Sequence, residues 1–303
     1  MMFKTKHFLS YAAALAVATI LCGSLTSCGD DEDELYPPKG NGLLVTSVGP
    51  HRFTYDESGK LTGISHDNET LAMQGDKLTL NTDDGTIQMS LSFNSDGLLT
   101  KIKFIEEDKY YKDEGTINYS YSGHRLKSLS FSAKGTEEHA TYEESGNANF
   151  TWKDGNLVQV AAAGKESERE EGVSYSDSWE TTYTFTYGSQ ANKFKQFPYF
   201  VGADITGYED NALCVVGFYG YGPDYLPTSC TEENVGNGKT EKQTNTLSFT
   251  LNADGILSSE SRGGRRVDYT YGTAATRAAG IAAQDMEHAV RFLRSGLFRH
   301  RRR

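Results

Sequence analysis

The chain has 303 residues and a net charge of −11, and it holds 18 Tyr and 15 Phe. Its positive charge sits at the two ends, where Lys4 and Lys6 open the chain and residues 273–303 hold seven Arg against Asp285 and Glu287. Taking the +2 and +5 of these ends from −11 leaves −18 for the residues between them. A main domain this acidic repels phosphate backbones, which excludes nucleic acid as its partner.

The first 27 residues follow the order of a secretory signal peptide. Two lysines precede an uncharged stretch at 8–25 that is rich in small and apolar residues. Its 18 residues approach the roughly 20 that a transmembrane helix needs, which is the alternative interpretation. The stretch ends in Leu25-Thr26-Ser27-Cys28, which resembles the lipobox of bacterial lipoproteins. That resemblance implies cleavage before Cys28, lipidation of its sulfur and a membrane as the first partner.

Residues 28–42 predict a flexible tether. The run "GDDEDELYPPKGNG" has five consecutive acids, a Pro pair and two glycines, and it has too little apolar surface to fold. Acids directly after a lipidated cysteine resemble the surface-export signal of Bacteroidetes lipoproteins. The resemblance implies an outer-membrane lipoprotein exposed at the cell surface, with a periplasm-facing position as the alternative.

Cleavage and lipidation would leave two cysteines, Cys214 and Cys230. A disulfide between them suits an oxidising compartment. Spacing alone does not show that the two thiols meet, so the pairing stays open.

Residues 43–272 repeat one pattern, which predicts β-hairpins. An apolar pair two residues apart is followed by a polar stretch that ends in Gly, and a Leu follows two or three residues later. The apolar pair alternates as one face of a strand does, and Gly can adopt the positive φ of a tight turn. Copies of the pattern lie at 53–64, 91–102, 119–129, 150–160 and 249–260.

The repeats predict an all-β fold, an antiparallel meander of a dozen or so strands. "TTYTFTY" at 181–187 alternates in the same way. A sheet this long curls strongly or closes into a barrel. The apolar positions are mostly Tyr and Phe and the other face is polar, which favours a water-soluble barrel over a membrane-spanning one.

Two resemblances support this architecture. The hairpin repeats resemble the YD repeats of Rhs-type shells. Together with the lipobox, the acidic tether and the loop "GFYGYGPDYLP", they also resemble an uncharacterised Bacteroidetes lipoprotein family, a domain of unknown function with a porin-like fold. This resemblance implies a porin-like fold and a location at the cell envelope, and it implies no activity.

The loop at 207–230 is the candidate ligand site. It concentrates aromatic side chains among glycines and prolines, where rings could stack on sugar faces and a carboxylate could accept hydroxyl hydrogen bonds. The alternative is a plug whose tyrosines pack against the end of the barrel. The candidate ligand-binding residues are Tyr208, Phe218, Tyr219, Tyr221, Asp224 and Tyr225.

No catalytic motif stands out, so we expect a non-enzyme with no metal site and no cofactor. The acid-rich segment at 137–144 could suggest a cation site, but alternate residues of a strand face opposite ways, so at most half of its acids converge. Asp56, Asp96, Asp154 and Asp254 recur in the predicted turns, where turn chemistry explains them.

The Arg-rich tail, 273–303, predicts at most an isolated helix. A basic amphipathic helix is typical of membrane-surface binding. The alternative is an appended end that is not part of the fold, and no site is assigned to it.

Two functions follow from these observations. The first is a non-catalytic, surface-tethered binding module for glycans or other nutrients. The second is a structural envelope protein, an accessory subunit that docks on an outer-membrane partner.

Overall fold

The computed structural model describes residues 43–66, 69–81, 85–137, 140–170, 172–201, 212–236 and 239–273. The predicted signal peptide, Cys28, the tether, Tyr208 and the Arg-rich tail beyond Thr273 lie outside the described residues. Among the residues in these ranges, no helix has the length and apolar character needed to cross a lipid bilayer.

The described ranges form a closed antiparallel barrel of sixteen strands in which each strand pairs with its neighbours in sequence. Pairing between the first and the last strand closes the barrel. This confirms the predicted all-β antiparallel meander and shows that the sheet closes into a barrel. The barrel has more strands than the expected dozen or so. The strands are β1 (Leu43–Val48), β2 (His51–Tyr55), β3 (Leu61–His66), β4 (Glu69–Gln74), β5 (Lys77–Asn81), β6 (Gly85–Phe93), β7 (Leu99–Asp108), β8 (Tyr111–Ser122), β9 (Arg125–Glu137), β10 (Ala140–Lys153), β11 (Asn156–Glu170), β12 (Val173–Ala191), β13 (Tyr225–Gly236), β14 (Lys239–Leu251), β15 (Leu257–Arg262) and β16 (Arg265–Thr273).

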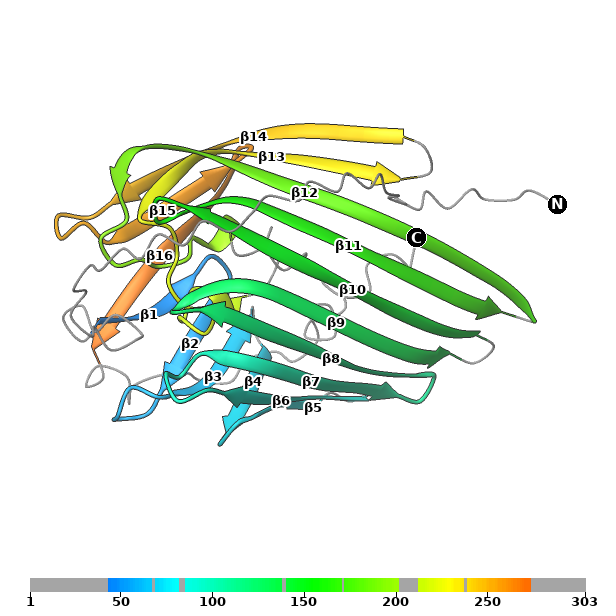
Figure 1. The fold of residues 1–303 in the computed structure, drawn as a ribbon. Coiled ribbons are helices and arrows are strands. Elements are labelled where there is room, and N and C mark those ends of the chain that lie inside the picture. Colours follow the sequence, from blue (N-terminus) through cyan, green and yellow to red (C-terminus); the bar gives the residue numbers. More distant parts are fainter. Residues whose placement is uncertain are drawn as a thin grey trace.

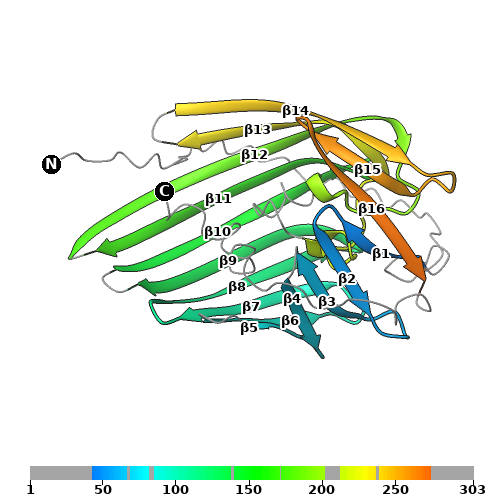
Figure 2. The same cartoon turned by 180° about the vertical axis from the view of Figure 1, so that it is seen from behind.

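The strands differ greatly in length, and this gives the barrel two unlike ends. Strands β1 to β5 have five or six residues each, whereas β9 to β12 have 13 to 19. Both views show the long strands continuing past the short ones as a curved sheet (Figures 1 and 2). The hydrophobic core lies at the end that all strands enclose, where residues from the β12–β13 connection, such as Phe197 and Tyr219, join the wall residues.

The five predicted hairpins are confirmed, and each carries an irregularity at the same place. The register shifts at the second residue of the apolar pair, one step before the turn. The extra residue of each bulge lies on the return strand, one position after the returning Leu, so that this Leu and the residue three positions later both face inward. The residues at the shift are Tyr55, Phe93, Tyr121, Trp152 and Leu251, and all of them pack against the core.

Neighbouring hairpins are linked by hydrogen bonds from aromatic side chains to backbone carbonyls. Tyr121 donates to the carbonyl of Leu99 at 2.7 Å, and Trp152 donates to that of Leu126 at 2.8 Å. Tyr187 continues the series on β12, donating to the carbonyl of Leu157 at 2.7 Å. In each case the acceptor is the Leu that starts the return strand of the preceding hairpin, so the repeated Tyr and Leu positions serve one repeated contact.

The side chains of the long strands separate by polarity between the two faces. On β8 the inward positions include Ile117 and Tyr119, which are buried. A transmembrane barrel turns an apolar band toward lipid. The outward positions of β8 are polar instead, namely Lys112, Glu114, Thr116, Asn118 and Ser120.

The bond from Tyr187 to the preceding hairpin can be tested with Tyr187→Phe. The variant keeps the ring but leaves the buried carbonyl of Leu157 without this donor, so the free energy of unfolding should fall by about 1 kcal/mol. Denaturant titration measures the change. Tyr175→Phe on the same strand is the control, because Tyr175 is 60% exposed and its loss should change stability little. Equal stability of the two variants would contradict the structural role of this bond.

Stability should also fall at alkaline pH. Burial raises the pKa of Tyr119, Tyr121 and Tyr187 above the ordinary value. Since the folded pKa values exceed the unfolded value of about 10, the stabilisation is complete below that pH and is lost as the pH rises beyond it. Tyrosinate absorbance and circular dichroism should therefore change together above pH ~10. Ionisation of all tyrosines near pH ~10 in a protein that stays folded would contradict this prediction.

Candidate functional site

The described residues of the segment between β12 and β13, 192–201 and 212–224, contribute many side chains to the core inside the barrel, and we call them the plug. Its aromatic side chains are almost completely buried, with Phe197 at 1%, Tyr199 at 2% and Tyr219 at 1% exposure. A short 3-10 helix at Ala212–Cys214 belongs to the same segment. The aromatic loop predicted as a ligand site thus lies mainly in the core.

Tyr219 and Phe218 make packing contacts in the barrel wall. The hydroxyl of Tyr219 lies 3.3 Å from that of Tyr119, and the two ring centroids are 5.2 Å apart. The carbonyl of Phe218 accepts the backbone N–H of Leu99 at 3.0 Å and the hydroxyl of Tyr121 at 3.2 Å. Both residues therefore hold the plug to the wall.

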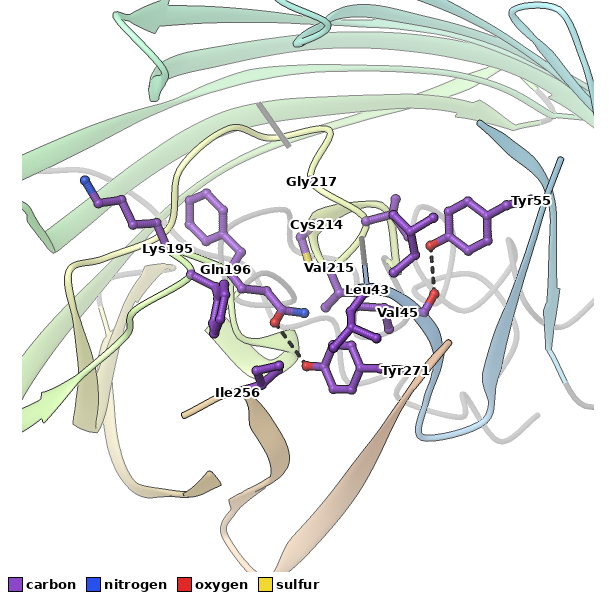
Figure 3. Close-up of a pocket in the computed structure, with 14 residues that line it drawn as sticks. Leu43, Val45, Tyr55, Lys195, Gln196, Cys214, Val215, Gly217, Ile256 and Tyr271 are labelled. Carbon is purple, nitrogen blue, oxygen red and sulfur yellow. Dashed lines mark hydrogen bonds between the residues drawn. The ribbon is translucent and has the colours of Figure 1, made fainter. Parts of the chain in front are cut away.

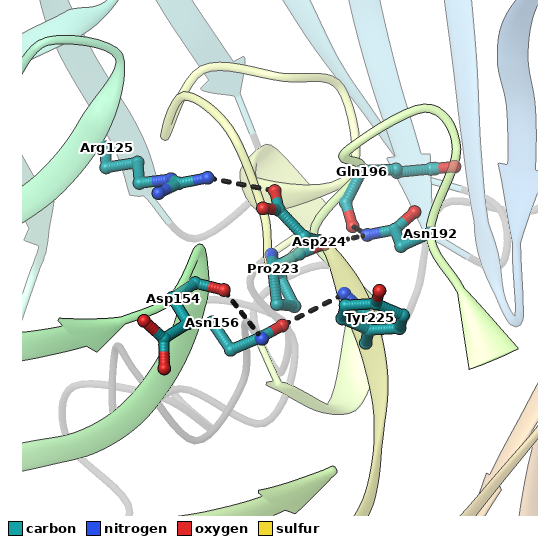
Figure 4. Close-up of polar contacts among 8 residues, drawn as sticks. All are labelled: Arg125, Asp154, Asn156, Asn192, Gln196, Pro223, Asp224 and Tyr225. Atoms are coloured by element: carbon teal, nitrogen blue, oxygen red, sulfur yellow. Dashed lines mark hydrogen bonds and ion pairs between the residues drawn. The ribbon is translucent and has the colours of Figure 1, made fainter. Parts of the chain in front are cut away.

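Asp224 and Tyr225 anchor the end of the plug to two hairpin turns (Figure 4). Asp224 pairs with the guanidinium of Arg125 at 2.9 Å, and its backbone N–H donates to the carbonyl of Gly155 at 3.0 Å. The backbone N–H of Tyr225 donates to the side-chain oxygen of Asn156 at 3.0 Å. Gly155 has φ +75, and an added Cβ there would meet the carboxylate of Asp224, so this turn needs glycine to approach the plug. These contacts give Asp224 a structural role.

Tyr221 is partly buried and Tyr225 is exposed. The Tyr221 ring lies 5.0 Å from that of His124 and 5.4 Å from the ammonium of Lys195, and Tyr225 is 41% exposed. The described candidate residues thus divide between the core and the barrel end. They do not form one ring surface.

Cys214 and Cys230 are both buried thiols, and no disulfide joins them in this structure. Burial, followed by the charge of Glu260, raises the pKa of Cys214. The pairing that the sequence left open is therefore not formed here.

A small cavity lies between the plug and strands β1 and β16 (Figure 3). Its volume is about 80 Å³, and its lining includes Leu43, Val45, Cys214 and Tyr271. An engineered cavity of about 150 Å³ holds one benzene molecule, so this one is too small for a sugar ring.

Buried polar groups also fix the plug. Glu260, at 1% exposure, accepts hydrogen bonds from the Tyr269 hydroxyl and the Phe200 backbone N–H, each at 3.0 Å. His51 lies 3.3 Å from the hydroxyl of Tyr199. Within the described ranges, no three His, Cys, Asp or Glu side chains lie together in a way that could hold a metal ion.

A second aromatic surface lies on the inner face of the long strands, beyond the plug. One row across four strands reads Phe131 on β9, Gly146 on β10, Gly164 on β11 and Trp179 on β12. The two rings are nearly parallel, with an interplanar angle of 14° and centroids 6.2 Å apart. We call these four residues the ring platform.

The two glycines allow the rings to lie flat on the sheet. A Cβ on Gly146 would come 2.6 Å from the Phe131 ring, and a Cβ on Gly164 would come 2.5 Å from the Trp179 ring. Each ring thus occupies the space above the glycine opposite it. Phe131 and Trp179 are only partly buried, so part of each side chain remains exposed.

Three carboxylates lie next to the platform on the same inner face, on the side away from the plug. Glu144, Glu166 and Asp177 are directly opposite one another on β10, β11 and β12, two residues along each strand from the platform. We call them the carboxylate row. Glu143 falls on the opposite face from Glu144, as strand alternation predicted for the 137–144 segment.

The outer face of the same strands holds a polar groove of about 660 Å³, lined mostly by outward-facing residues of β8 to β12. The ion pair between Lys134 and Glu114, with its nitrogen and oxygen 2.9 Å apart, lies along it.

The sequence interpretation missed the platform. The signal was present as isolated glycines within alternating strands, a pattern that marks close approach to a glycine backbone. Only the register of β9 to β12 shows which aromatic lies opposite each glycine.

The packing role of Tyr219 can be tested with two variants. Tyr219→Ala should lower the free energy of unfolding by about 3 kcal/mol, because a buried ring is removed. Tyr219→Phe keeps the ring and should cost about 1 kcal/mol. Denaturant titration measures both, and a Tyr219→Ala protein as stable as the unchanged chain would contradict the core position.

No protein-family model matches the chain, and no curated protein matches it. Among solved structures, it is similar to a porin-like protein from Bacteroides vulgatus ATCC 8482, with a TM-score of 0.47 and 12% identity over 75% of this chain and 98% of that chain. It is also similar to a porin-like protein from Bacteroides uniformis ATCC 8492, with a TM-score of 0.26 and 16% identity over 65% of this chain and 94% of that one. The structural neighbours of this barrel are thus described as porin-like proteins from Bacteroides, and at these identities the likeness concerns the fold alone.

Proposed function

We propose that the chain is a non-catalytic binding protein of the bacterial envelope, tethered through Cys28, that binds a glycan on the ring platform. The tether rests on the lipobox-like Leu25-Thr26-Ser27-Cys28 and the acidic run after it. The same residues support display at the cell surface, with a periplasm-facing position as the alternative.

The observation that carries this proposal is the geometry of Phe131 and Trp179. Two nearly parallel rings, with centroids 6.2 Å apart, lie over glycines and are partly exposed. A pyranose ring presents C–H groups on one face, and this apolar face packs on aromatic rings while its hydroxyls reach polar side chains. Binding sites commonly combine apolar and aromatic surface with a few polar anchors of this kind.

The carboxylates of the described interior differ between the plug and the platform. Near the plug, Asp224 pairs with Arg125 and Glu260 accepts two hydrogen bonds from the core. The partly exposed carboxylates of the inner face border a surface that suits stacking.

An accessory envelope protein is the second candidate. The polar groove on the outer face of β8 to β12 favours it, because that groove offers a partner protein charged side chains of both signs, such as Lys134 and Glu143. Under this alternative an outer-membrane protein would co-purify with the chain, and the association would survive loss of the platform rings.

Removal of one platform ring tests glycan binding. A glycan array with the full chain should identify binding oligosaccharides, and Trp179→Ala should weaken their affinity about tenfold. An aromatic contact is worth ~0.5–1.5 kcal/mol, and 1.4 kcal/mol corresponds to a factor of ten. Calorimetric titration of the best array ligand measures the change.

Tyr110→Ala is the matched control, because Tyr110 is an aromatic residue 59% exposed outside the platform. Gly146→Ala is a second probe, since its Cβ should displace the Phe131 ring and weaken binding with both rings present. An empty array, or affinity unchanged in Trp179→Ala, would overturn the proposal.

A further inference from the structure

The carboxylate row places acidic side chains beside the ring platform. Glu144 is directly opposite Glu166, and Glu166 is directly opposite Asp177. All three side chains are partly exposed. Glu168 follows on the next inward row of β11, between Tyr142 and Tyr175. Four carboxylates therefore lie close to the platform.

Basic side chains of the same strands point the other way. Lys134 on β9 and Lys165 and Arg169 on β11 occupy exposed, outward positions. Across the described residues of β9 to β12, the inward positions from the platform to the far strand ends hold no Lys or Arg. Among the described residues of these strands, the inner face thus carries acidic side chains, and the outer face carries side chains of both signs.

The spacing allows one sugar to contact both the rings and the carboxylates. Two residues along a strand span ~7 Å, so the carboxylate row begins about one sugar width from the platform. A pyranose stacked on Trp179 would direct its ring substituents at Glu166 and Asp177, and a longer oligosaccharide would extend across Glu144.

From this arrangement we infer that the platform selects oligosaccharides bearing free, protonated amino groups over neutral and acidic ones. The inference rests on the proposed glycan-binding function and names the ligand class of that site. An ammonium next to a carboxylate forms a charge-assisted hydrogen bond, which is stronger than a neutral one. An ammonium over Trp179 also gains cation–π attraction. Uronic acids would meet charge of their own sign.

Three oligosaccharides of equal length test the selectivity of the full chain: glucosamine hexamer, N-acetylglucosamine hexamer and galacturonate hexamer. Calorimetry at a pH where the amines are protonated should give an affinity for the glucosamine hexamer about tenfold or more above the neutral hexamer, and no binding of the galacturonate hexamer. Added salt should reduce this advantage, because it screens partly exposed charges.

The double variant Glu144→Gln, Glu166→Gln removes the charge and keeps the side-chain shape. It should abolish the preference for the glucosamine hexamer and leave the affinity for the neutral hexamer unchanged. Glu143→Gln is the matched control, since Glu143 neighbours Glu144 but points outward, and it should leave both affinities unchanged. Thermal denaturation verifies that the variants are folded.

The outcomes separate the inference from the proposed function. Equal binding of the amino and neutral hexamers, with no effect of the double Gln variant, would overturn the selectivity and leave glycan binding intact. Absence of binding by every saccharide would overturn both. An oligolysine peptide that binds as tightly as the glucosamine hexamer, with no loss in Trp179→Ala, would show a general surface for polycations and would also overturn the selectivity.

Discussion

The barrel depends on one repeated contact, the hydrogen bond from an aromatic side chain to the carbonyl that starts the preceding hairpin's return strand. Tyr121, Trp152 and Tyr187 make it in turn to Leu99, Leu126 and Leu157. Strand alternation points the aromatic residue inward, the bulge after each turn points the returning Leu inward, and the donated bond satisfies a carbonyl at the turn end of the barrel. A buried carbonyl without a donor would be costly, so the repeated aromatic and Leu positions of these hairpins have one physical cause.

The plug and the long strands divide the interior into two regions of different character. Around the plug, tyrosine hydroxyls, Glu260 and Arg125 make hydrogen bonds and ion pairs within the fold. Beyond it, Phe131 and Trp179 cover two glycines, and carboxylates line the wall. Aromatic residues are abundant in both regions, but Phe197, Tyr199 and Tyr219 of the plug are almost completely buried, whereas Phe131 and Trp179 are only partly buried.

The hairpins could be predicted from sequence because their signals are local. Alternation, the turn glycines and the returning Leu lie within about twelve residues, and all five turns were located by them. The position of Tyr219 could not be predicted, because an aromatic loop has the same composition whether it enters a barrel or covers its end. The platform depends on non-local register: Phe131 meets Gly146 and Trp179 meets Gly164 only when β9 to β12 are aligned.

Closure of the ring by its first and last strands has a consequence for assembly. The seam is the pairing of β1 with β16. Residues 43–48 can form it only after residues 269–273 have been synthesised, and the segment between β12 and β13 is synthesised earlier than those residues. The seam joins residues more than 220 positions apart, so it has the largest loop-closure cost of all the strand pairs in the barrel.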